Sequence, residues 1–264
     1  MKITKLSQKL IDQIAAGEIV ERPASVVKEL LENSIDAGAD KISVKVFEGG
    51  SRLIIVSDNG SGIQKNDLVL AIENHATSKI STQEDLQNCN SHGFRGEALA
   101  AIASVANIKI RSKVRSSENG FELVKTNGDW EIFLSPVHDG TDIIVEDLFH
   151  NVPARKRFLK NNTTEFKHCQ SIFIQLSLVY PEIEFSLFHQ GREVLQLRKS
   201  SGMGRFAEIF ELKAEQVKVN TKQFEDLKIN LFMSTNQEAN KKISHFVYVN
   251  NRTIKNSTVS YAIK

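Results

Sequence analysis

The stretch Pro23-Ala-Ser-Val-Val-Lys-Glu-Leu-Leu-Glu-Asn-Ser-Ile-Asp-Ala-Gly38 carries the clearest periodicity in the chain. Its apolar residues recur at the spacing of one helix face. Pro23 suits the first turn of a helix, and Gly38 suits the position just after its end. The sequence therefore predicts a helix over Pro23–Ala37.

A polar stripe runs beside the apolar face of this helix. Glu29, Asn33 and Asp36 are spaced i, i+4 and i+7, which places them on one narrow side. Mg²⁺ prefers oxygen ligands, so the side-chain carbonyl of Asn33 could serve as a metal ligand. Glu29, one turn away, could serve as the general base that deprotonates a water molecule. A solvated polar face has the same spacing, and on spacing alone it is the more common outcome.

Two stretches rich in β-branched residues follow, Lys41–Phe47 and Leu53–Asp58, and predict a β-hairpin. The second ends in the tight loop Asp58-Asn-Gly-Ser-Gly62. A carboxylate at a strand end can accept a hydrogen bond from the amine of adenine, and glycines let the backbone approach a flat ligand. An ordinary Asx turn would look the same.

Further along the chain, Gly93 and Gly96 precede a predicted helix over Glu97–Val105. The free backbone N–H groups at the start of this helix could bind phosphate, and Lys79 could add a positive charge. Ile80–Gly96 reads as a functional loop. The other expected elements are a short helix Asp67–Ile72, strands Ile108–Lys113, Phe121–Lys125, Glu131–Leu134 and Thr141–Glu146, a helix Glu165–Leu178, and two strands within Pro181–Leu197.

The composition is that of a folded globular protein, with 41% hydrophobic and 25% charged residues among 264. These values exclude disordered, collagen-like and coiled-coil classes, and a net charge of +2 is too small to indicate nucleic-acid binding by itself. The linker-like stretch Ser200–Gly204 places a domain boundary there. We expect a first domain over 1–199 and an incomplete second domain over 200–264.

The location of the protein also follows from the sequence. Two cysteines form no disulfide framework, the N-terminus has no signal-peptide core, and no apolar run approaches the ~20 residues of a membrane helix. We expect a soluble cytoplasmic protein without a membrane partner.

Three other motif types bear on the function of this chain. A Walker P-loop is absent, and Gly202-Met-Gly-Arg-Phe-Ala207 resembles a dinucleotide fingerprint but follows a linker rather than a strand. Ser25-Val-Val-Lys28 and Ser57-Asp-Asn59 match two of three serine β-lactamase motifs, and the third, Lys-Thr-Gly, is missing. A serine acyl-transfer enzyme remains an alternative.

Five motifs occur along the first part of the chain, namely Gln13-Ile-Ala-Ala-Gly-Glu through Gly38, Asp58-Asn-Gly-Ser-Gly62, His75-Ala-Thr-Ser-Lys79, Gly93-Phe-Arg-Gly-Glu-Ala-Leu99, and Leu148 to Leu159. Together they closely resemble the MutL family of DNA mismatch repair ATPases. The resemblance implies an α+β chain: a two-layer α/β sandwich of the Bergerat (GHKL) type with a mixed sheet, followed by part of a smaller, transducer-like α/β domain.

The resemblance also implies roles for single residues. Glu29 would be the general base, Asn33 the Mg²⁺ ligand and Asp58 the adenine contact, assisted by Thr141. The remaining ATP contacts would line the base pocket or close over the phosphates: Gly62, Ile63, Thr77, Ser78, Lys79, Gly93, Phe94, Arg95, Gly96, Glu97, Ala98 and Leu99.

The implied function is an ATPase module of mismatch repair in the bacterial cytoplasm and nucleoid. Slow Mg²⁺-dependent ATP hydrolysis would switch dimerisation with a second copy and contacts with DNA, the mismatch-recognition protein MutS, and a downstream nuclease or helicase. Arg155, Lys160, Arg252 and Lys255 are candidate DNA contacts, which solvated surface charge explains equally well. The family's γ-phosphate lysine, in an Asn-Val-His-Pro-Ala-Lys-like stretch, is not found, so an ATP- and DNA-binding module without hydrolysis is the alternative.

Overall fold

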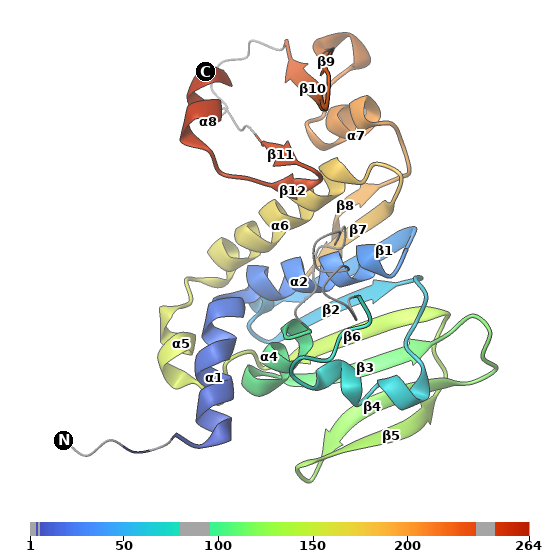
Figure 1. Cartoon of the computed structure of the whole chain (residues 1–264), viewed down its shortest axis with the longest axis vertical. Helices are drawn as coiled ribbons and strands as arrows, with labels where there is room; N and C mark the ends of the chain where they lie inside the picture. The colour runs from blue at the N-terminus through green and yellow to red at the C-terminus, as the bar shows by residue number, and fades with distance from the viewer. Residues whose placement is uncertain (1–3, 5, 80–95, 236–245, 264) are drawn as a thin grey trace. The chain divides into compact units, whose positions relative to one another are not determined.

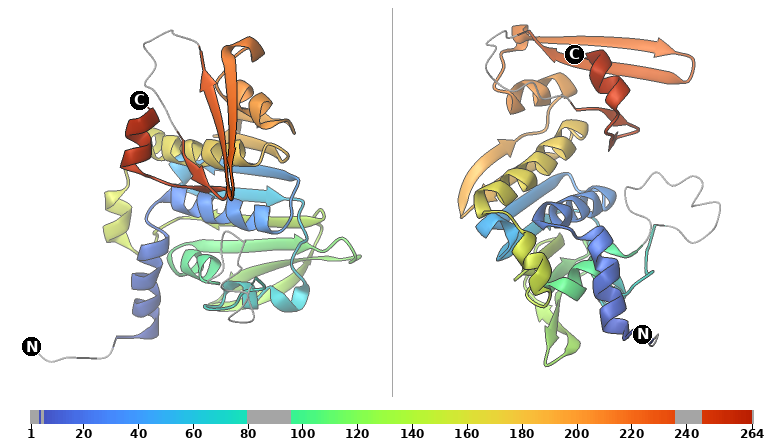
Figure 2. Two further views of the ribbon diagram at one scale, coloured as in Figure 1. Left: turned by 45° about the horizontal axis from the view of Figure 1, so that its top comes forward. Right: turned by 90° about the vertical axis from the view of Figure 1, so that its left-hand side faces the viewer.

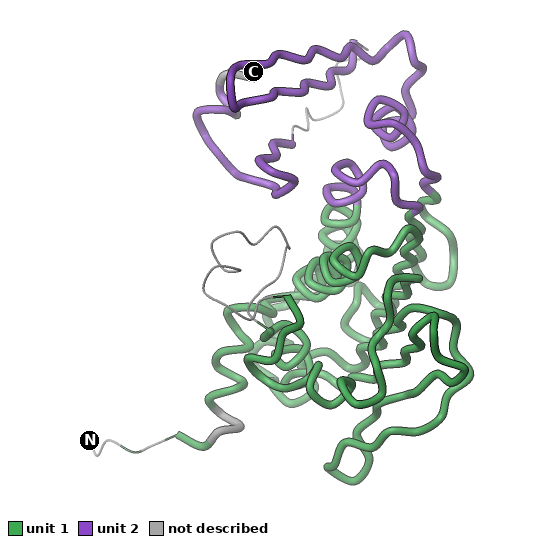
Figure 3. The backbone as a smooth tube through the Cα atoms, turned by 45° about the vertical axis from the view of Figure 1, so that its right-hand side comes forward, with its two compact units in different colours: residues 1–173, 185–196 green, residues 174–184, 197–264 purple. Residues whose placement is uncertain are grey.

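The computed structural model describes residues 4, 6–79, 96–235 and 246–263. Two compact units divide the chain (Figure 3). The first comprises Met1–Phe173 with Phe185–Gln196, and the second comprises Ile174–Glu184 with Leu197–Lys264.

An eight-stranded sheet forms the centre of the first unit (Figure 1), in the order β5-β4-β3-β6-β2-β1-β7-β8. The Gln190 N–H, just after β7, donates to the Val46 carbonyl near the end of β1, 3.1 Å away. The carboxyl ends of these two strands therefore lie together, and the sheet is mixed. Its strands are β1 Lys41–Phe47, β2 Leu53–Asp58, β3 Asn107–Lys113, β4 Gly120–Thr126, β5 Asp129–Ser135, β6 Gly140–Glu146, β7 Glu184–His189 and β8 Arg192–Leu197.

Alternating burial along the strands shows which face of the sheet is covered. In β1, Ile42, Val44 and Val46 are buried and their neighbours are not. Helix α2, Pro23–Asp36, packs on β2 and β1 with an apolar face that includes the buried Leu30. The predicted hairpin and helix are confirmed, and so is the α/β class with a mixed sheet.

Four further helices belong wholly or mainly to this unit: α1 Gln8–Ile19, α4 Ala98–Val105, α5 Pro153–Phe158 and α6 Asn162–Val179. Helix α1 packs against α4 (Figure 2) and was not predicted. Its apolar stripe is incomplete, because Ala16 is buried whereas Ile11 and Ile14 are 38% and 54% exposed. Among the described residues, no helix is long and apolar enough to cross a membrane.

Short 3-10 turns connect several of these elements. The turn η1, Glu48–Gly50, joins the hairpin strands. The expected single helix Asp67–Ile72 is wrong, because two separate turns occupy this region, η2 Lys65–Asp67 and η3 Leu70–Ile72.

The second unit contains small elements: α7 Gly202–Ile209, η4 Ala214–Gln216, a hairpin of β9 Val217–Phe224 and β10 Leu227–Ser234, the paired β11 Tyr248–Val249 and β12 Arg252–Thr253, and α8 Ser257–Ile263. The predicted linker over Ser200–Gly204 is wrong. The Ser201 hydroxyl accepts a hydrogen bond from the Gly204 N–H and caps α7. The glycines around it therefore start a helix.

Arg205 is the largest fully buried side chain of the second unit. Its guanidinium donates to carbonyls at the end of α6, in the following turn and after β8, those of Ser177, Tyr180, Pro181, Ile183 and Arg198, at 2.7 to 3.5 Å. The dinucleotide-like stretch Gly202–Ala207 thus places an arginine in the core and lies within α7.

We expect Arg205→Lys to lower the free energy of unfolding by about 3 kcal/mol or more, because one ammonium cannot satisfy these buried carbonyls and each unsatisfied group costs about 1–3 kcal/mol. Urea unfolding followed by circular dichroism measures the change. The control Arg198→Lys, at an exposed side chain, should cost less than about 0.5 kcal/mol. Equal stability of the two variants would contradict the role of Arg205.

Candidate functional site

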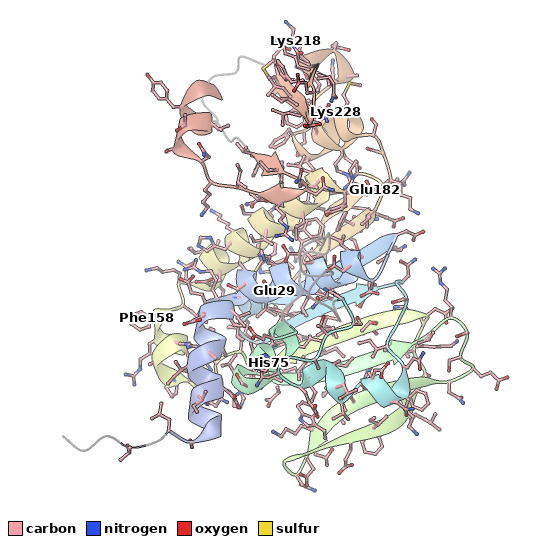
Figure 4. The ribbon with its side chains drawn as sticks, viewed as in Figure 1. Glu29, His75, Phe158, Glu182, Lys218 and Lys228 are labelled. Atoms are coloured by element: carbon pink, nitrogen blue, oxygen red, sulfur yellow. The ribbon has the colours of Figure 1, made fainter. Side chains whose placement is uncertain are left out.

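At the start of the polar stripe of α2, one lysine forms two ion pairs. The Lys28 ammonium lies 3.0 Å from Glu29 Oε1 and 3.0 Å from Glu32 Oε2. Burial alone would lower the pKa of Lys28, but the two carboxylates outweigh it and raise the pKa. The lysine therefore stays charged beside Glu29, whose side chain is 24% exposed. Glu29 is labelled on α2 in Figure 4.

The next turns of α2 carry Asn33 and Asp36, and both contact Lys79. The Lys79 ammonium donates to Asn33 Oδ1 at 3.0 Å and to Asp36 Oδ2 at 2.5 Å. The Lys79 N–H donates to Thr77 Oγ1 at 3.2 Å, so a local turn fixes the backbone from which this lysine extends. The structure thus brings the predicted residues Asn33 and Lys79 together.

Asp58, at the end of β2, is joined to the same helix. Its Oδ2 accepts a hydrogen bond from Ser34 Oγ at 2.8 Å, and its Oδ1 accepts one from the Gly60 N–H at 2.9 Å. Burial raises the pKa of Asp58, while these hydrogen bonds oppose the rise. Since Ser34 follows Asn33 directly, the predicted metal ligand and the predicted adenine contact lie on neighbouring parts of one site.

A second polar cluster lies beside Asp58 on the sheet. Thr141 is opposite Asp58 in the β2–β6 register, and its Oγ1 lies 2.9 Å from Ser112 Oγ. Ser112 is fully buried and accepts a hydrogen bond from the Ile63 N–H at 2.8 Å. Sequence reasoning missed Ser112. Its signal was a polar residue at a position where the alternation of β3 predicts an apolar one.

Gly62 follows the Asp58 loop and has a backbone conformation that favours glycine, with φ of 74°. A Cβ there would lie 2.4 Å from the Lys113 carbonyl oxygen. No side chain fits at this position, so glycine is needed for the loop to approach β3.

The segment after η3 lies against the start of α4. The His75 N–H donates to the Gly96 carbonyl at 3.1 Å, and His75 Nδ1 lies 3.2 Å from Glu97 Oε1. At Gly96, φ is 62° and a Cβ would lie 2.3 Å from the Ala76 carbonyl oxygen. His75, labelled in Figure 4, and Lys79 therefore belong to a segment held beside the N-terminus of α4.

For the other predicted ATP contacts, the structure gives burial only, or does not describe the residue. Ala98 and Leu99 are half-buried in the first turn of α4, and Ser78 is exposed. Gly93, Phe94 and Arg95 lie outside the described residues.

The predicted DNA contacts fall in different environments. Lys160, Arg252 and Lys255 are exposed. The Arg155 side chain instead lies on α1, where its Nη2 donates to the Gln13 carbonyl at 3.0 Å. A contact between Arg155 and DNA stays a prediction, and the structure gives this arginine a protein partner.

The serine acyl-transfer alternative gains nothing from the geometry. Ser25 lies in the first turn of α2, but Lys28 faces the two glutamates rather than acting as a free base. Ser57 lies inside β2 and is paired on both sides, opposite Ser43 and Asp142.

Comparisons with known proteins show which family this chain resembles. Residues 21–137 match the family model described as histidine kinase-, DNA gyrase B-, and HSP90-like ATPase. The chain is 42% identical to the DNA mismatch repair protein MutL of Persephonella marina, over all of this chain and 50% of that protein. A solved structure, the Aquifex aeolicus MutL ATPase domain complexed with ADP, matches with a TM-score of 0.76 and 33% identity, covering 92% of this chain and 87% of that one.

This chain belongs to the MutL family. The MutL protein of Shewanella woodyi is likewise 42% identical, over all of this chain and 44% of its own length. The chain thus spans about half the length of these MutL relatives. In this MutL-family chain, the family model covers α2, β2 and β3, the elements that carry Glu29, Asn33, Asp58 and Ser112.

The buried carboxyl of Asp58 predicts a pH dependence of stability in the ligand-free protein. Its folded-state pKa is raised above the ordinary value of 3.8, so the native state binds more protons than the unfolded state as the pH rises above 3.8. The contribution of the Asp58 carboxyl to the free energy of unfolding therefore falls as the pH rises from 3.8 through the raised pKa. The variant Asp58→Asn has no such carboxyl and does not lose this stability.

The measurement is urea unfolding of both proteins between pH 3.5 and pH 7. The free energy of unfolding of Asp58→Asn minus that of the wild type should grow through this window and then stay constant. A difference that is flat, or that shrinks with rising pH, would show that burial does not raise the pKa.

Proposed function

We propose that this chain is the ATP-binding and ATP-hydrolysing region of a MutL-type mismatch repair protein. One observation carries the proposal: consecutive residues of α2 reach both ends of the candidate site, Asn33 toward Lys79 and Ser34 toward Asp58. A single helix thereby sets the distance between a polar, cation-holding end and a buried carboxylate. The ADP named for the Aquifex aeolicus relative is a ligand of this kind.

The Asp58 end suits adenine. The carboxylate has acceptor capacity beyond its bonds from Ser34 and Gly60, and an exocyclic amine is a donor. The buried Ser112–Thr141 pair keeps β3 and β6 in place beside it. Because these groups are fixed by the sheet before any ligand binds, the base would meet a preformed surface.

The Asn33 end suits Mg²⁺ and phosphate. Asn33 Oδ1 already holds a cation, the Lys79 ammonium, and an amide oxygen is a ligand type that Mg²⁺ prefers. Asn33 would hold the metal, which when bound neutralises charge on the phosphates. Lys79 would supply a positive charge there.

Glu29 is the proposed general base. It lies one turn before Asn33 on the same stripe and is partly exposed, so its carboxylate can orient a water molecule and accept its proton. The Lys28 ammonium, 3.0 Å away, holds the carboxylate of Glu29 in one place. Lys28 is thus a positioning residue for Glu29.

We expect Glu29→Ala to bind ATP as the wild type does and to lose about 100-fold or more in steady-state phosphate release, the usual contribution of a general base. Because ATP stays bound to this variant without being hydrolysed, the proposed dimer should also accumulate. Light scattering would detect the dimer as a doubled particle mass. Glu193→Ala, at an exposed position of β8, is the control. Normal hydrolysis by Glu29→Ala would refute the assignment.

The alternative is a module that binds ATP and DNA without hydrolysis, which the unfound lysine stretch favours. Phosphate release that does not exceed that of an Asn33→Ala variant would support this alternative. Release clearly above that variant would exclude it.

In the full protein, we propose that the nucleotide state controls pairing of two copies and contacts with DNA, MutS and a downstream nuclease or helicase. The support is membership of the MutL family together with the exposed Lys160, Arg252 and Lys255. Each such cation that contacts a phosphate releases bound counterions, so binding must weaken with salt.

Lys160→Ala should weaken DNA binding similarly for different sequences and reduce the slope of log K against log salt by about 1, because one phosphate contact is lost. Fluorescence anisotropy with labelled duplexes at several salt concentrations measures the slope. Lys109→Ala removes an equal charge from a lysine paired with Glu146 and should leave the slope unchanged. Equal slopes for Lys160→Ala and the wild type would exclude Lys160 as a contact.

A further inference from the structure

The Lys79 ammonium is held by two side chains of α2 at once. Asn33 Oδ1 and Asp36 Oδ2 accept its hydrogen bonds at 3.0 and 2.5 Å. The Lys79 and Asp36 side chains are only 21% and 9% exposed, so water screens this ion pair far less than a surface pair. The contact is therefore a defined feature of the ligand-free site.

The position of Lys79 is built from the backbone outward. Asn33 and Asp36 are three residues apart on a helix, which places their oxygens on one side. The Lys79 backbone is fixed by Thr77, and the preceding His75 is bonded to Gly96. Both partners of the ammonium thus belong to one rigid helix, and the lysine extends from a segment that is itself held in place.

The Asn33 oxygen is the one proposed above to hold Mg²⁺. A divalent cation at this oxygen would lie within a few ångströms of the ammonium, and two positive charges at that separation repel strongly. Lys79 has a flexible four-carbon stem, so its ammonium can leave Asn33 for a phosphate oxygen. The carboxylate of Asp36 opposes that departure.

We propose that Lys79 is a resident cation of the Asn33–Asp36 pair, and that Asp36 sets the Mg²⁺ concentration the site requires by retaining Lys79 there. Asp36 is then a positioning residue that acts through Lys79. This inference rests on the proposed function, because it concerns the same nucleotide site.

A direct role of Asp36 in metal binding makes the opposite prediction. If the carboxylate helped to hold Mg²⁺, its removal would raise the Mg²⁺ requirement. If it retains Lys79, its removal lowers the requirement, because the competing ammonium is held less tightly. The direction of the change therefore separates the two roles.

The test is a Mg²⁺ titration of the binding of a fluorescent, non-hydrolysable ATP analogue, with free Mg²⁺ set by a chelator. We expect Asp36→Asn to lower the half-saturating Mg²⁺ concentration about fivefold, the effect of losing one partly buried ion pair. At saturating Mg²⁺ its affinity for the analogue should stay within about twofold of the wild type, because Lys79 has then left Asp36. Asp36→Glu keeps the carboxylate and should move the Mg²⁺ requirement back toward the wild-type value.

The matched control is Glu146→Gln, which changes the charge equally and removes the Lys109–Glu146 ion pair on the sheet. Its titration curve should coincide with that of the wild type. Thermal unfolding of each variant shows that the fold is retained.

Each remaining outcome has one meaning. An unchanged or raised Mg²⁺ requirement for Asp36→Asn, with normal binding by the wild type, overturns the inference alone. Wild-type protein that binds the analogue at no Mg²⁺ concentration overturns the proposed function and the inference together.

Discussion

The hydrogen bond from Ser34 Oγ to Asp58 Oδ2 is the contact on which the geometry of the site depends. It joins the polar side of α2 to the end of a central strand, and both partners are buried. A buried carboxylate is costly unless its oxygens are hydrogen-bonded, and Asp58 receives donors from Ser34, Gly60 and the backbone of Thr141. Because α2 is rigid, the same contact also determines where Asn33 and Glu29 lie.

Most of the negative charge along α2 is offset by two lysines, Lys28 and Lys79. Lys28 is shared between Glu29 and Glu32, and Lys79 pairs with Asp36, so two positive charges offset most of three negative ones. Carboxylates without a counter-charge would repel one another, and they would also repel the phosphates that the proposed function places at this site. The two lysines have different partners on α2, Glu29 and Glu32 for Lys28, and Asn33 and Asp36 for Lys79.

Strong periodicity made much of the fold predictable. The α2 helix and the β1–β2 hairpin were predicted closely because each shows one clear period with turn residues at its ends. The sequence does not predict helix α1, whose apolar residues Ile11 and Ile14 stay exposed while Ala16 is buried. The start of α7 has the composition of a linker, because its serine cap is followed by glycine.

The candidate site was predicted in part, for a related reason. Glu29, Asn33 and Asp58 could be named because helix spacing and a strand end place them. The partners of these residues come from distant segments: Lys79 reaches α2 across 46 and 43 residues of sequence, and Ser112 reaches Ile63 across 49. Such pairings depend on tertiary packing, which local patterns do not report.

The contact of Arg155 with α1 has a consequence for how this region can vary. Its guanidinium occupies the space over Gly17, where a Cβ would lie 1.8 Å from Nη2. Even the methyl group of alanine at position 17 would displace the arginine, and a shorter side chain at position 155 would remove its side-chain donor from the Gln13 carbonyl. As sequences diverge, the residues at positions 17 and 155 should therefore change together, because any side chain at position 17 requires the guanidinium of Arg155 to move.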